Sequence, residues 1–316
     1  MVAKIFIDGE AGTTGLQIRE RLARRRDIDL VSIPSDKRKD VETRKALLNE
    51  ADVAILCLPD DAARESVSLI ENDTTKVIDA STAHRVAEGW DYGFAEMDRD
   101  HGAKIAASRR VANPGCYPQG VIAFLRPLVN AGIVPEGLPV TVNAISGYSG
   151  GGRSMIEAYE KGEGKNAPFM PYALGLSHKH LPEMQIYSKL EKAPLFQPAV
   201  GDYAQGMVTF VPLQLETLPK VPTGAELHAA VADHYSAIAG SFVDVAPFEA
   251  AEKLSGLDPQ TFNGTNHMRL HVFANDRRAQ ALLVAVYDNL GKGASGAAVQ
   301  NLNLMLGVDA STSLAA

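Results

Sequence analysis

Short apolar runs alternate with helical patterns over the first hundred residues, and this alternation constrains the fold more than any other feature of the chain. The apolar runs lie at residues 2–7, 30–33, 53–58 and 76–80. Helical patterns lie between them, the clearest at residues 40–49 and 62–70. Such runs are typical of parallel strands that connecting helices bury on both faces. We therefore expect an α/β fold that begins with a Rossmann-like, doubly wound parallel sheet.

The pattern changes after about residue 115. Longer β-branched strands are predicted at residues 140–145, 207–211, 269–274 and 281–287. Irregular stretches at residues 161–174 and 192–205 separate some of them. A capping box formed by Thr223 and Glu226 marks one helix, and the final helical pattern covers residues 295–306. A second domain of the α+β class, with mostly antiparallel strands, is therefore expected.

Length and composition exclude several classes of protein. A chain of 316 residues fits about two domains. No apolar stretch reaches the roughly 20 residues that cross a bilayer, and no secretory signal pattern precedes Lys4. Two cysteines are too few for a disulfide framework, so a cytoplasmic location is expected. The net charge of −7 argues against nucleic acid as a partner and requires any anion site to be local.

A glycine-rich loop follows the first apolar run. Its spacing is G-x-x-G-x-x-G, a variant of the dinucleotide fingerprint. Glycines allow a tight turn, and the free N–H groups of the following helix attract a pyrophosphate. An ordinary strand-to-helix turn is the alternative reading, and Glu10 would repel a phosphate unless its carboxylate points away. The candidate cofactor residues here are Gly9, Gly12, Thr13, Thr14 and Gly15.

The end of the second apolar run bears on the choice between NAD and NADP. An acidic residue there binds a ribose 2′-hydroxyl, whereas cations and hydroxyls accommodate a 2′-phosphate. Ser35, Lys37 and Arg38 surround one acid, Asp36, which favours NADP(H). A solvated basic turn is the alternative. Pro59, after the third run, completes the candidate cofactor residues of this region.

The hexapeptide NPGCYP at residues 113–118 is the most informative in the chain. Pro118 suits a first helical turn, and apolar residues follow it, so Cys116 is predicted at a helix N-terminus. This position lowers a thiol pKa because the helix dipole favours the thiolate. Cys57 lies inside an apolar run and is interpreted as a small buried hydrophobe.

Two further segments carry chemistry. In residues 178–183, His180 is the candidate base for the thiol, and Glu183 is the group that would orient its imidazole. The H-x-H pair is a poor zinc site without more ligands, so no metal is expected. Residues 146–153 form a glycine loop in which Ser146 and Arg153 are candidates for binding a carboxylate or phosphate. A glycine turn with a solvent-facing arginine is the alternative.

These motifs resemble those of the N-acetyl-gamma-glutamyl-phosphate reductases of the short type, from arginine biosynthesis. The resemblance covers essentially the whole chain. It rests on the glycine loop, NPGCYP, residues 146–153, H-x-H-x-P-E at residues 178–183, and N-L-x-K-G-A-x-G at residues 289–296. Glu10 and Thr13 depart from the commoner small-residue version of the glycine loop.

The resemblance implies a domain plan and a chemistry. Residues 1–115 would form the NADP-binding Rossmann domain, completed by the C-terminal helix at residues 289–316. Residues 116–288 would form a catalytic and oligomerisation domain of the glyceraldehyde-3-phosphate dehydrogenase type, joined as a homodimer or homotetramer. The family reduces N-acetyl-glutamyl 5-phosphate to the semialdehyde with NADPH and releases phosphate.

The resemblance also implies roles for individual residues. Cys116 matches the nucleophile, His180 the acid–base histidine and Glu183 its partner. Asn289 and Gly293 would lie near the nicotinamide. As a hypothesis, the residues that bind the anionic substrate are Ser81, Arg110, Asn113, Ser146 and Arg153.

Three alternatives stay open at this point. The substrate could be a related acyl phosphate, such as an aspartyl or N-acetyl-aminoadipyl phosphate. The chain could be a non-catalytic regulator that binds NADP, although a sensor has no need for a nucleophile. A cofactor-free thiol hydrolase is disfavoured by the glycine loop and the basic turn.

Overall fold

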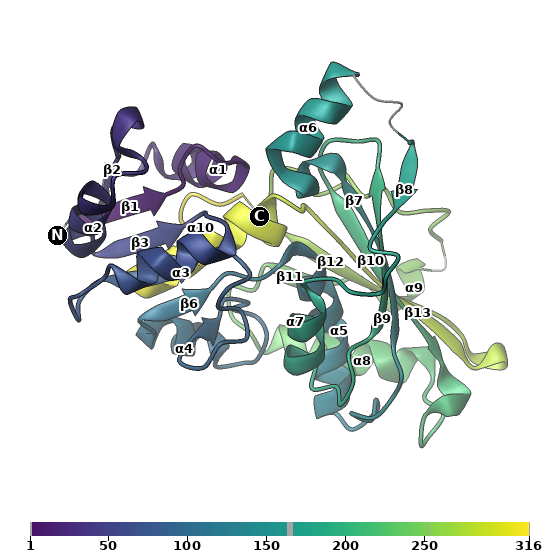
Figure 1. Cartoon of the computed structure of the whole chain (residues 1–316). Coiled ribbons are helices and arrows are strands. Elements are labelled where there is room, and N and C mark those ends of the chain that lie inside the picture. Colours follow the sequence, from purple (N-terminus) through teal and green to yellow (C-terminus); the bar gives the residue numbers. More distant parts are fainter. Residues whose placement is uncertain (1, 163–166, 252, 316) are drawn as a thin grey trace. The chain divides into compact units, whose positions relative to one another are not determined.

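The computed structural model describes residues 2–162, 167–251 and 253–315. They form two compact units (Figure 1). The first contains residues 1–95, 100–114 and 294–315, and the second contains residues 96–99 and 115–293. The sequence predicts domain boundaries after residues 115 and 288, and the boundaries between the two units lie after residues 114 and 293. Met1, Ala316 and part of the expected irregular stretch 161–174 lie outside the described residues.

The first unit is built on a six-stranded sheet with the order β2-β1-β3-β4-β6-β5, in which every described pair is parallel. Its strands are β1 (Ala3–Asp8), β2 (Ile28–Val31), β3 (Val53–Leu56), β4 (Lys76–Asp79), β5 (Asp91–Tyr92) and β6 (Arg110–Ala112). Its helices are α1 (Thr13–Leu22), the 3-10 turn η1 (Ser35–Lys37), α2 (Val41–Glu50), α3 (Asp60–Ser68), α4 (His101–Ala107) and α10 (Gly296–Leu306). This confirms the doubly wound parallel sheet.

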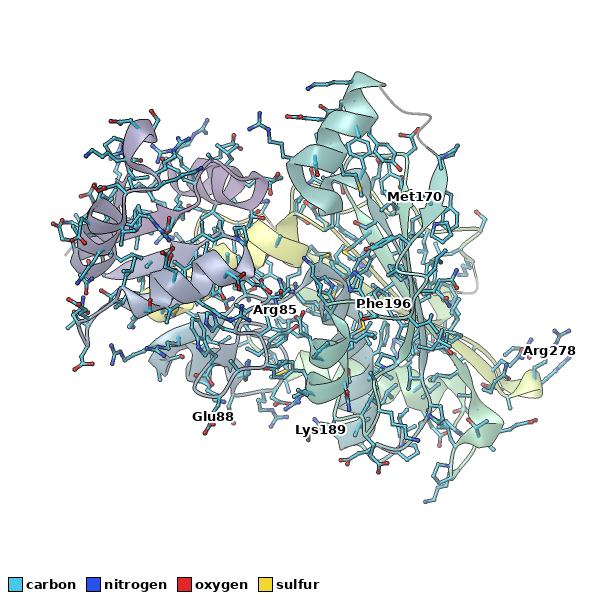
Figure 2. The ribbon with its side chains drawn as sticks, in the orientation of Figure 1. Arg85, Glu88, Met170, Lys189, Phe196 and Arg278 are labelled. Carbon is cyan, nitrogen blue, oxygen red and sulfur yellow. The ribbon has the colours of Figure 1, made fainter. Side chains whose placement is uncertain are left out.

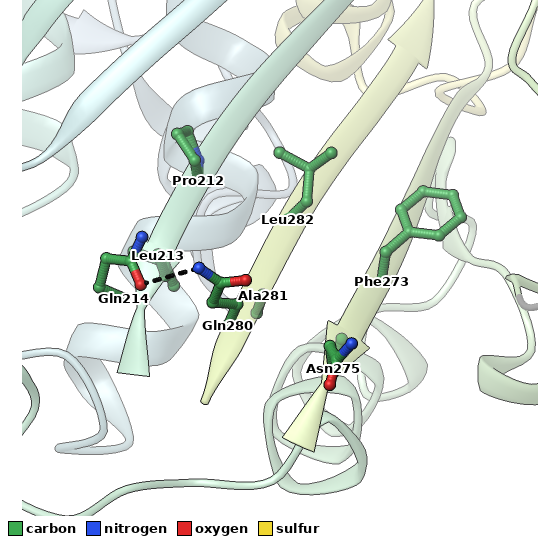
Figure 3. A pocket seen from close by; sticks show the side chains of 9 residues that line it. Pro212, Leu213, Gln214, Phe273, Asn275, Gln280, Ala281 and Leu282 are labelled. Atoms are coloured by element: carbon green, nitrogen blue, oxygen red, sulfur yellow. Dashed lines mark hydrogen bonds between the residues drawn. The ribbon is translucent and has the colours of Figure 1, made fainter. Parts of the chain in front are cut away.

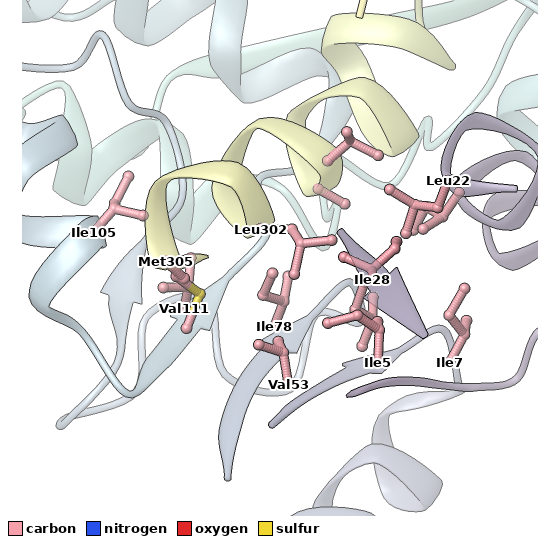
Figure 4. Close-up of a cluster of buried hydrophobic side chains, with 14 of the residues drawn as sticks. Ile5, Ile7, Leu22, Ile28, Val53, Ile78, Ile105, Val111, Leu302 and Met305 are labelled. Atoms are coloured by element: carbon pink, nitrogen blue, oxygen red, sulfur yellow. The ribbon is translucent and has the colours of Figure 1, made fainter. Parts of the chain in front are cut away.

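The core of this unit joins the two ends of the chain. Val299, Leu302 and Met305 of α10 pack with Ile5 of β1 and Ile78 of β4 in one buried cluster (Figure 4). The apolar spacing of residues 295–306 predicted this helix. The spacing by itself does not indicate where this helix packs. In the folded unit its apolar face lies on the apolar face of a sheet whose strands end almost 200 residues earlier in the sequence.

The second unit contains a seven-stranded sheet with the order β11-β12-β13-β10-β7-β9-β8. Its strands are β7 (Thr141–Gly147), β8 (Phe169–Pro171), β9 (Leu195–Gly201), β10 (Met207–Gln214), β11 (Val243–Val245), β12 (Met268–Asn275) and β13 (Gln280–Tyr287). Its α-helices are α5 (Cys116–Asn130), α6 (Gly152–Lys161), α7 (Leu181–Tyr187), α8 (Gly224–Ser236) and α9 (Phe248–Ala251). Shorter turns are η2 (Tyr148–Gly151), η3 (Leu215–Thr217), η4 (Asp276–Arg278) and a π-helical turn, η5 (Gly291–Ser295).

Most of the described strand pairs in this sheet are antiparallel, but β11 with β12 and β7 with β9 are parallel. The predictions that residues 161–174 and 192–205 are irregular are wrong, because β8 lies in the first stretch and β9 lies in the second, between β7 and β8. Pro198 lies inside β9, although proline is rare in the middle of a sheet because it has no N–H to donate. The capping box at Thr223 is present as predicted.

A pocket of about 400 Å³ lies at the ends of β10, β12 and β13 (Figure 3). Pro212 faces Leu282 across the strand pair, and Gln280 donates a hydrogen bond to Gln214 at 3.3 Å. None of the candidate catalytic residues lines this pocket. No helix in the described part of the chain is long and apolar enough to cross a bilayer.

Candidate functional site

The glycine loop has the tight backbone that a dinucleotide requires. Gly9 has a φ of +90°, and a Cβ there would lie 2.3 Å from the carbonyl oxygen of Cys57. A Cβ on Gly15 would lie 2.5 Å from the carbonyl oxygen of Gly9. Gly12 donates its N–H to that same oxygen at 3.0 Å and is the N-cap of α1. Thr13 and Thr14 then begin the helix, so their N–H groups belong to the helix end that attracts anions.

The carboxylate of Glu10 is directed toward α1 and the end of β2. Its Oε2 accepts from Arg19 at 2.6 Å and from Ser32 at 3.2 Å. The carboxylate is therefore paired with a cation, which removes the objection that it would repel a phosphate in the loop.

The sequence analysis did not predict a hydrogen-bond network around Asp8, the residue directly before Gly9. Asp8, the last residue of β1, is buried and accepts hydrogen bonds from Arg44 at 3.2 Å and Ser66 at 2.8 Å. Arg44 also donates to Glu65 at 2.9 Å. This buried network fixes the end of β1 just before Gly9. No local pattern signals it, because its members come from three elements.

The other cofactor candidates of the first unit lie at the same sheet edge. β1, β2 and β3 are parallel, so the loops that follow them share the edge at their carboxyl ends. Ser35 and Lys37 form η1 directly after β2, and Arg38 follows; all three are exposed. Pro59 is also exposed and caps α3 after β3. The structure thus brings the predicted phosphate loop and the basic turn to one edge.

Cys116 is the first residue of α5, as the sequence predicted, with Gly115 as N-cap. The hydroxyl of buried Tyr287 donates to the carbonyl oxygen of Cys116 at 2.7 Å. The same hydroxyl accepts the N–H of Gly120 at 3.2 Å. A side chain from β13 therefore braces the first turn of the helix that carries the thiol.

Cys57 differs from Cys116 in its surroundings. It directly follows β3 and packs against the core of the first unit. Burial, together with the charges of Asp79 and Asp8, raises the pKa of this thiol to about 12. The thiol of Cys57 is therefore protonated at neutral pH and inert, as the sequence indicated.

Glu183 is bonded to the backbone of the residue before Cys116. Its Oε2 accepts the N–H of Gly115 at 2.9 Å, and its side chain is buried. Glu183 lies in the first turn of α7, and His180 is the N-cap of that helix. One short helix thus supplies both His180 and the carboxylate that holds the residue before Cys116. The bond to Gly115 was not predicted, because no spacing rule connects positions 115 and 183.

Aromatic rings surround His180. Its buried ring lies 4.7 Å from that of His178 and 5.9 Å from that of Tyr117. Phe196 of β9, labelled in Figure 2, packs against Tyr117 at 5.2 Å. Tyr172 donates to the Tyr117 hydroxyl at 3.2 Å, and burial raises the pKa of Tyr172 to about 12. The imidazole of His180 is therefore buried next to a cluster of aromatic side chains.

Gly293 lies directly beside Cys116 within the second unit. A Cβ on Gly293 would be 3.1 Å from the Cβ of Cys116. Asn289 is buried and fixes two other segments: its Oδ1 accepts from Gly206 N–H at 2.7 Å, and its Nδ2 donates to Ser149 at 2.9 Å. The C-terminal motif therefore places Gly293 against Cys116 and connects Asn289 to Gly206 and Ser149.

Three of the suggested substrate ligands have structural partners in the first unit. Ser81 donates to Asp79 at 2.7 Å, and Asn113 donates to the carbonyl oxygen of Ala294 at 3.0 Å. Arg110 is exposed at the amino end of β6 and lies over the ring of Trp90 at 5.9 Å. Ligands of doubly wound sheets bind at the carboxyl edge, so the position of Arg110 does not favour a substrate contact.

The other two suggested ligands belong to the second unit. Ser146 is buried near the end of β7, where its hydroxyl donates to the carbonyl oxygen of Gly147 at 3.1 Å. Arg153 begins the first turn of α6 and pairs with Glu157 at 2.8 Å, with its side chain 80% exposed. This is the solvent-facing arginine of the alternative reading. Within the described residues, no cluster of three or more metal-ligating side chains is present.

Comparisons with known proteins agree with this geometry. Residues 4–105 match the family model for the semialdehyde dehydrogenase NAD binding domain, and residues 116–289 match that for the semialdehyde dehydrogenase dimerisation domain. A protein from Chelativorans sp. (strain BNC1) called N-acetyl-gamma-glutamyl-phosphate reductase is 69% identical over 97% of this chain and 99% of its own length. A protein of that name from Mesorhizobium japonicum is 66% identical over 98% of this chain and 100% of its own length.

Solved structures extend the similarity to the fold. A probable aspartate-semialdehyde dehydrogenase from Pseudomonas aeruginosa superposes with a TM-score of 0.73 at 15% identity, covering 97% of this chain and 99% of that one. Aspartate semialdehyde dehydrogenase II from Vibrio cholerae gives 0.70 at 15% identity, with 97% and 98% covered. At this identity the likeness concerns the fold alone.

Proposed function

This chain belongs to the N-acetyl-gamma-glutamyl-phosphate reductase family, and we propose that it reduces N-acetyl-L-glutamyl 5-phosphate to N-acetyl-L-glutamate 5-semialdehyde with release of phosphate. The observation that carries the proposal is the placement of Cys116 at the first position of α5, with Glu183 bonded to the preceding Gly115 at 2.9 Å. A thiol there is favoured as thiolate by the helix dipole.

The proposed mechanism uses three residues of this chain. The sulfur of Cys116 attacks the acyl carbon, the bond to the phosphate oxygen breaks, and phosphate leaves with its electron pair. When bound, the nicotinamide cofactor supplies the hydride that reduces the resulting thioester. His180 donates a proton to the oxygen of the thiohemiacetal as it forms and takes it back when the C–S bond breaks and the aldehyde leaves. Glu183 holds the backbone before Cys116 throughout. Covalent catalysis thus divides one difficult reduction into two easier steps.

A dinucleotide fits the residues at the carboxyl edge of the first sheet. The cradle at Gly9 and Gly15 has no room for a Cβ, and the start of α1 offers free N–H groups to a pyrophosphate. We propose that Gly12, Thr13 and Thr14 contact this pyrophosphate. The cofactor is proposed to be NADP(H), because Ser35, Lys37 and Arg38 are exposed where a 2′-phosphate would lie.

Replacing both Lys37 and Arg38 by alanine should raise KM for NADPH about 10- to 100-fold and change KM for NADH less than about threefold. The two lost phosphate contacts are exposed, charge-assisted hydrogen bonds that together contribute about 1.4–2.8 kcal/mol. Steady-state kinetics with both cofactors measures this. Arg24→Ala with Arg26→Ala, a basic pair after α1, is the matched control. Equal losses for NADPH and NADH would contradict the NADP assignment.

The choice of substrate is tested with a panel of acyl phosphates. We expect kcat/KM for N-acetyl-glutamyl phosphate to exceed that for aspartyl and N-acetyl-aminoadipyl phosphate by at least about tenfold, the discrimination that one methylene or a lost polar contact provides. If another acyl phosphate of the panel is preferred, the proposed substrate is wrong and the proposed mechanism still applies. Absence of phosphate-dependent NADP⁺ reduction with any of the semialdehydes would favour the non-catalytic regulator.

We further propose that the second unit joins copies of the chain into a homodimer or homotetramer. The matching family model is described as a dimerisation domain. Ser146 and Arg153 remain proposed substrate ligands of this unit. If Arg153 binds the substrate, it must exchange its exposed pairing with Glu157, which costs little because surface ion pairs contribute only about 0–1 kcal/mol.

A further inference from the structure

A buried ion pair lies in the second unit and has no part in the mechanism above. The ammonium of Lys292 donates to Oε2 of Glu96 at 2.6 Å, and both side chains are 1% exposed. Glu96 also accepts the N–H of Phe242 at 3.2 Å. The two partners are 196 residues apart in sequence. A buried pair of this kind is weak evidence for stability, because desolvation offsets much of the Coulomb attraction.

The same segment contacts the helix of the nucleophile. The carbonyl oxygen of Lys292 accepts Nε2 of Gln119, one turn after Cys116, at 2.7 Å. The next residue, Gly293, is the one whose Cα faces the Cβ of Cys116. Gly293 also donates its N–H to the carbonyl oxygen of Asp288 at 2.9 Å. Residues 291–293 are therefore attached to Glu96 through the side chain of Lys292 and to α5 through their backbone.

We propose that Lys292 and Glu96 are positioning residues for Cys116. Their ion pair holds residues 291–293 against the first turn of α5, so that Gly293 limits the orientations of the Cys116 thiol. The role of this pair in catalysis rests on the proposed function, whereas its effect on the thiol does not. Without Lys292, the buried carboxylate of Glu96 loses its cation, and the turn relieves this loss by moving toward solvent. Gly293 then leaves Cys116, and the sulfur gains orientations that do not lead to attack.

The test compares Lys292→Met with Arg126→Met in the full-length protein. Arg126 is the control for the loss of an ion pair to the same short segment, residues 96–99: it lies in α5 and pairs with Asp98 through a 2.7 Å bond. Two readouts are used besides urea unfolding. One is kcat with KM for both substrates. The other is the rate of iodoacetamide alkylation at Cys116, followed by peptide mass as a function of pH.

We expect Lys292→Met to lower kcat about 10- to 100-fold with KM changed less than about threefold, since small misplacements of a reacting group cost up to about 10²-fold. Its alkylation rate and pH profile should change as well. Arg126→Met removes a less buried ion pair, with side chains 14% and 37% exposed, and should keep both readouts. If Lys292→Met keeps the kcat and the alkylation profile of the unmodified chain, the pair is merely structural and the proposal fails.

Glu96→Gln keeps the test decisive if Lys292→Met does not fold. Burial lowers the pKa of Lys292, and the carboxylate of Glu96 counteracts this. The amide removes the charge but keeps the shape, so we expect a smaller change in the same direction for both readouts. Unchanged readouts in folded Glu96→Gln overturn the proposal. Alkylation requires no substrate, so a changed alkylation profile in a protein without reductase activity would refute the proposed function alone.

Discussion

Replacing Cys116 by serine should abolish turnover and leave NADPH binding intact. Serine keeps the helix start, the bracing bond from Tyr287 and the contact with Gly293, because the two side chains differ only in the terminal atom. The hydroxyl, however, is a far weaker nucleophile than a thiolate at neutral pH, and no thioester can form. Removal of a catalytic nucleophile typically lowers kcat on the order of 10³- to 10⁶-fold.

Two measurements and one control make this prediction decisive. NADPH oxidation in the presence of the acyl phosphate gives kcat, and fluorescence titration gives Kd for NADPH. This Kd should change less than about twofold, because the proposed pyrophosphate-binding loop belongs to the other unit. Cys57→Ser, which changes the other cysteine of the chain, should retain activity in folded protein. Near-normal turnover by the Cys116 variant would refute covalent catalysis.

Replacing Gly15 by alanine should have the opposite signature, a large loss of cofactor binding with an unchanged thiol. The new Cβ would lie 2.5 Å from the carbonyl oxygen of Gly9 and 2.8 Å from Cα of Glu10, both backbone atoms that cannot rotate away. The loop must shift by several tenths of an ångström, at a cost of about 1–3 kcal/mol. Since the proposed pyrophosphate contacts are made by this backbone, Kd for NADPH should rise at least about 10-fold.

Gly102→Ala is the matched control for this variant. Gly102 also lies in a helix of the first unit, α4, where a Cβ meets nothing within 4 Å, so alanine should be neutral or stabilising. Alkylation of Cys116 should be the same in both variants, because the thiol belongs to the second unit. If Gly15→Ala binds NADPH as tightly as Gly102→Ala, the loop is an ordinary strand-to-helix turn and the cofactor assignment is wrong.

Features that depend on neighbours in sequence were predictable. Alternating apolar runs indicated the parallel sheet, the capping box at Thr223 indicated α8, and the proline after Cys116 indicated that the thiol begins a helix. Each follows from local backbone preference or from side-chain periodicity, so a short window of residues contains the information. The exception is β9, which lies in a stretch predicted to be irregular and is formed by pairing with β7 on one side and β8 on the other.

The use of individual polar side chains was not predictable, because it depends on partners brought together by folding. Asn113 belongs to the most specific motif, yet its amide donates to the carbonyl oxygen of Ala294 in η5. The sequence predicts that Glu10 would repel a phosphate unless its carboxylate points away. In the structure this carboxylate accepts hydrogen bonds from Arg19 and Ser32. Glu183 was chosen as a partner for His180, and the structure shows its bond to the backbone of Gly115.

The sequence by itself determined the class of fold, the helical position of Cys116, and the family, since each rests on the order and spacing of residue types. Only the tertiary structure decided that Glu183 accepts a hydrogen bond from the residue before Cys116. It also decided that Gly293, near the other end of the chain, lies against the side chain of Cys116. The physical reason is that hydrogen bonds and steric contacts act over about 3–4 Å, and segments far apart in sequence come that close only when the core is packed.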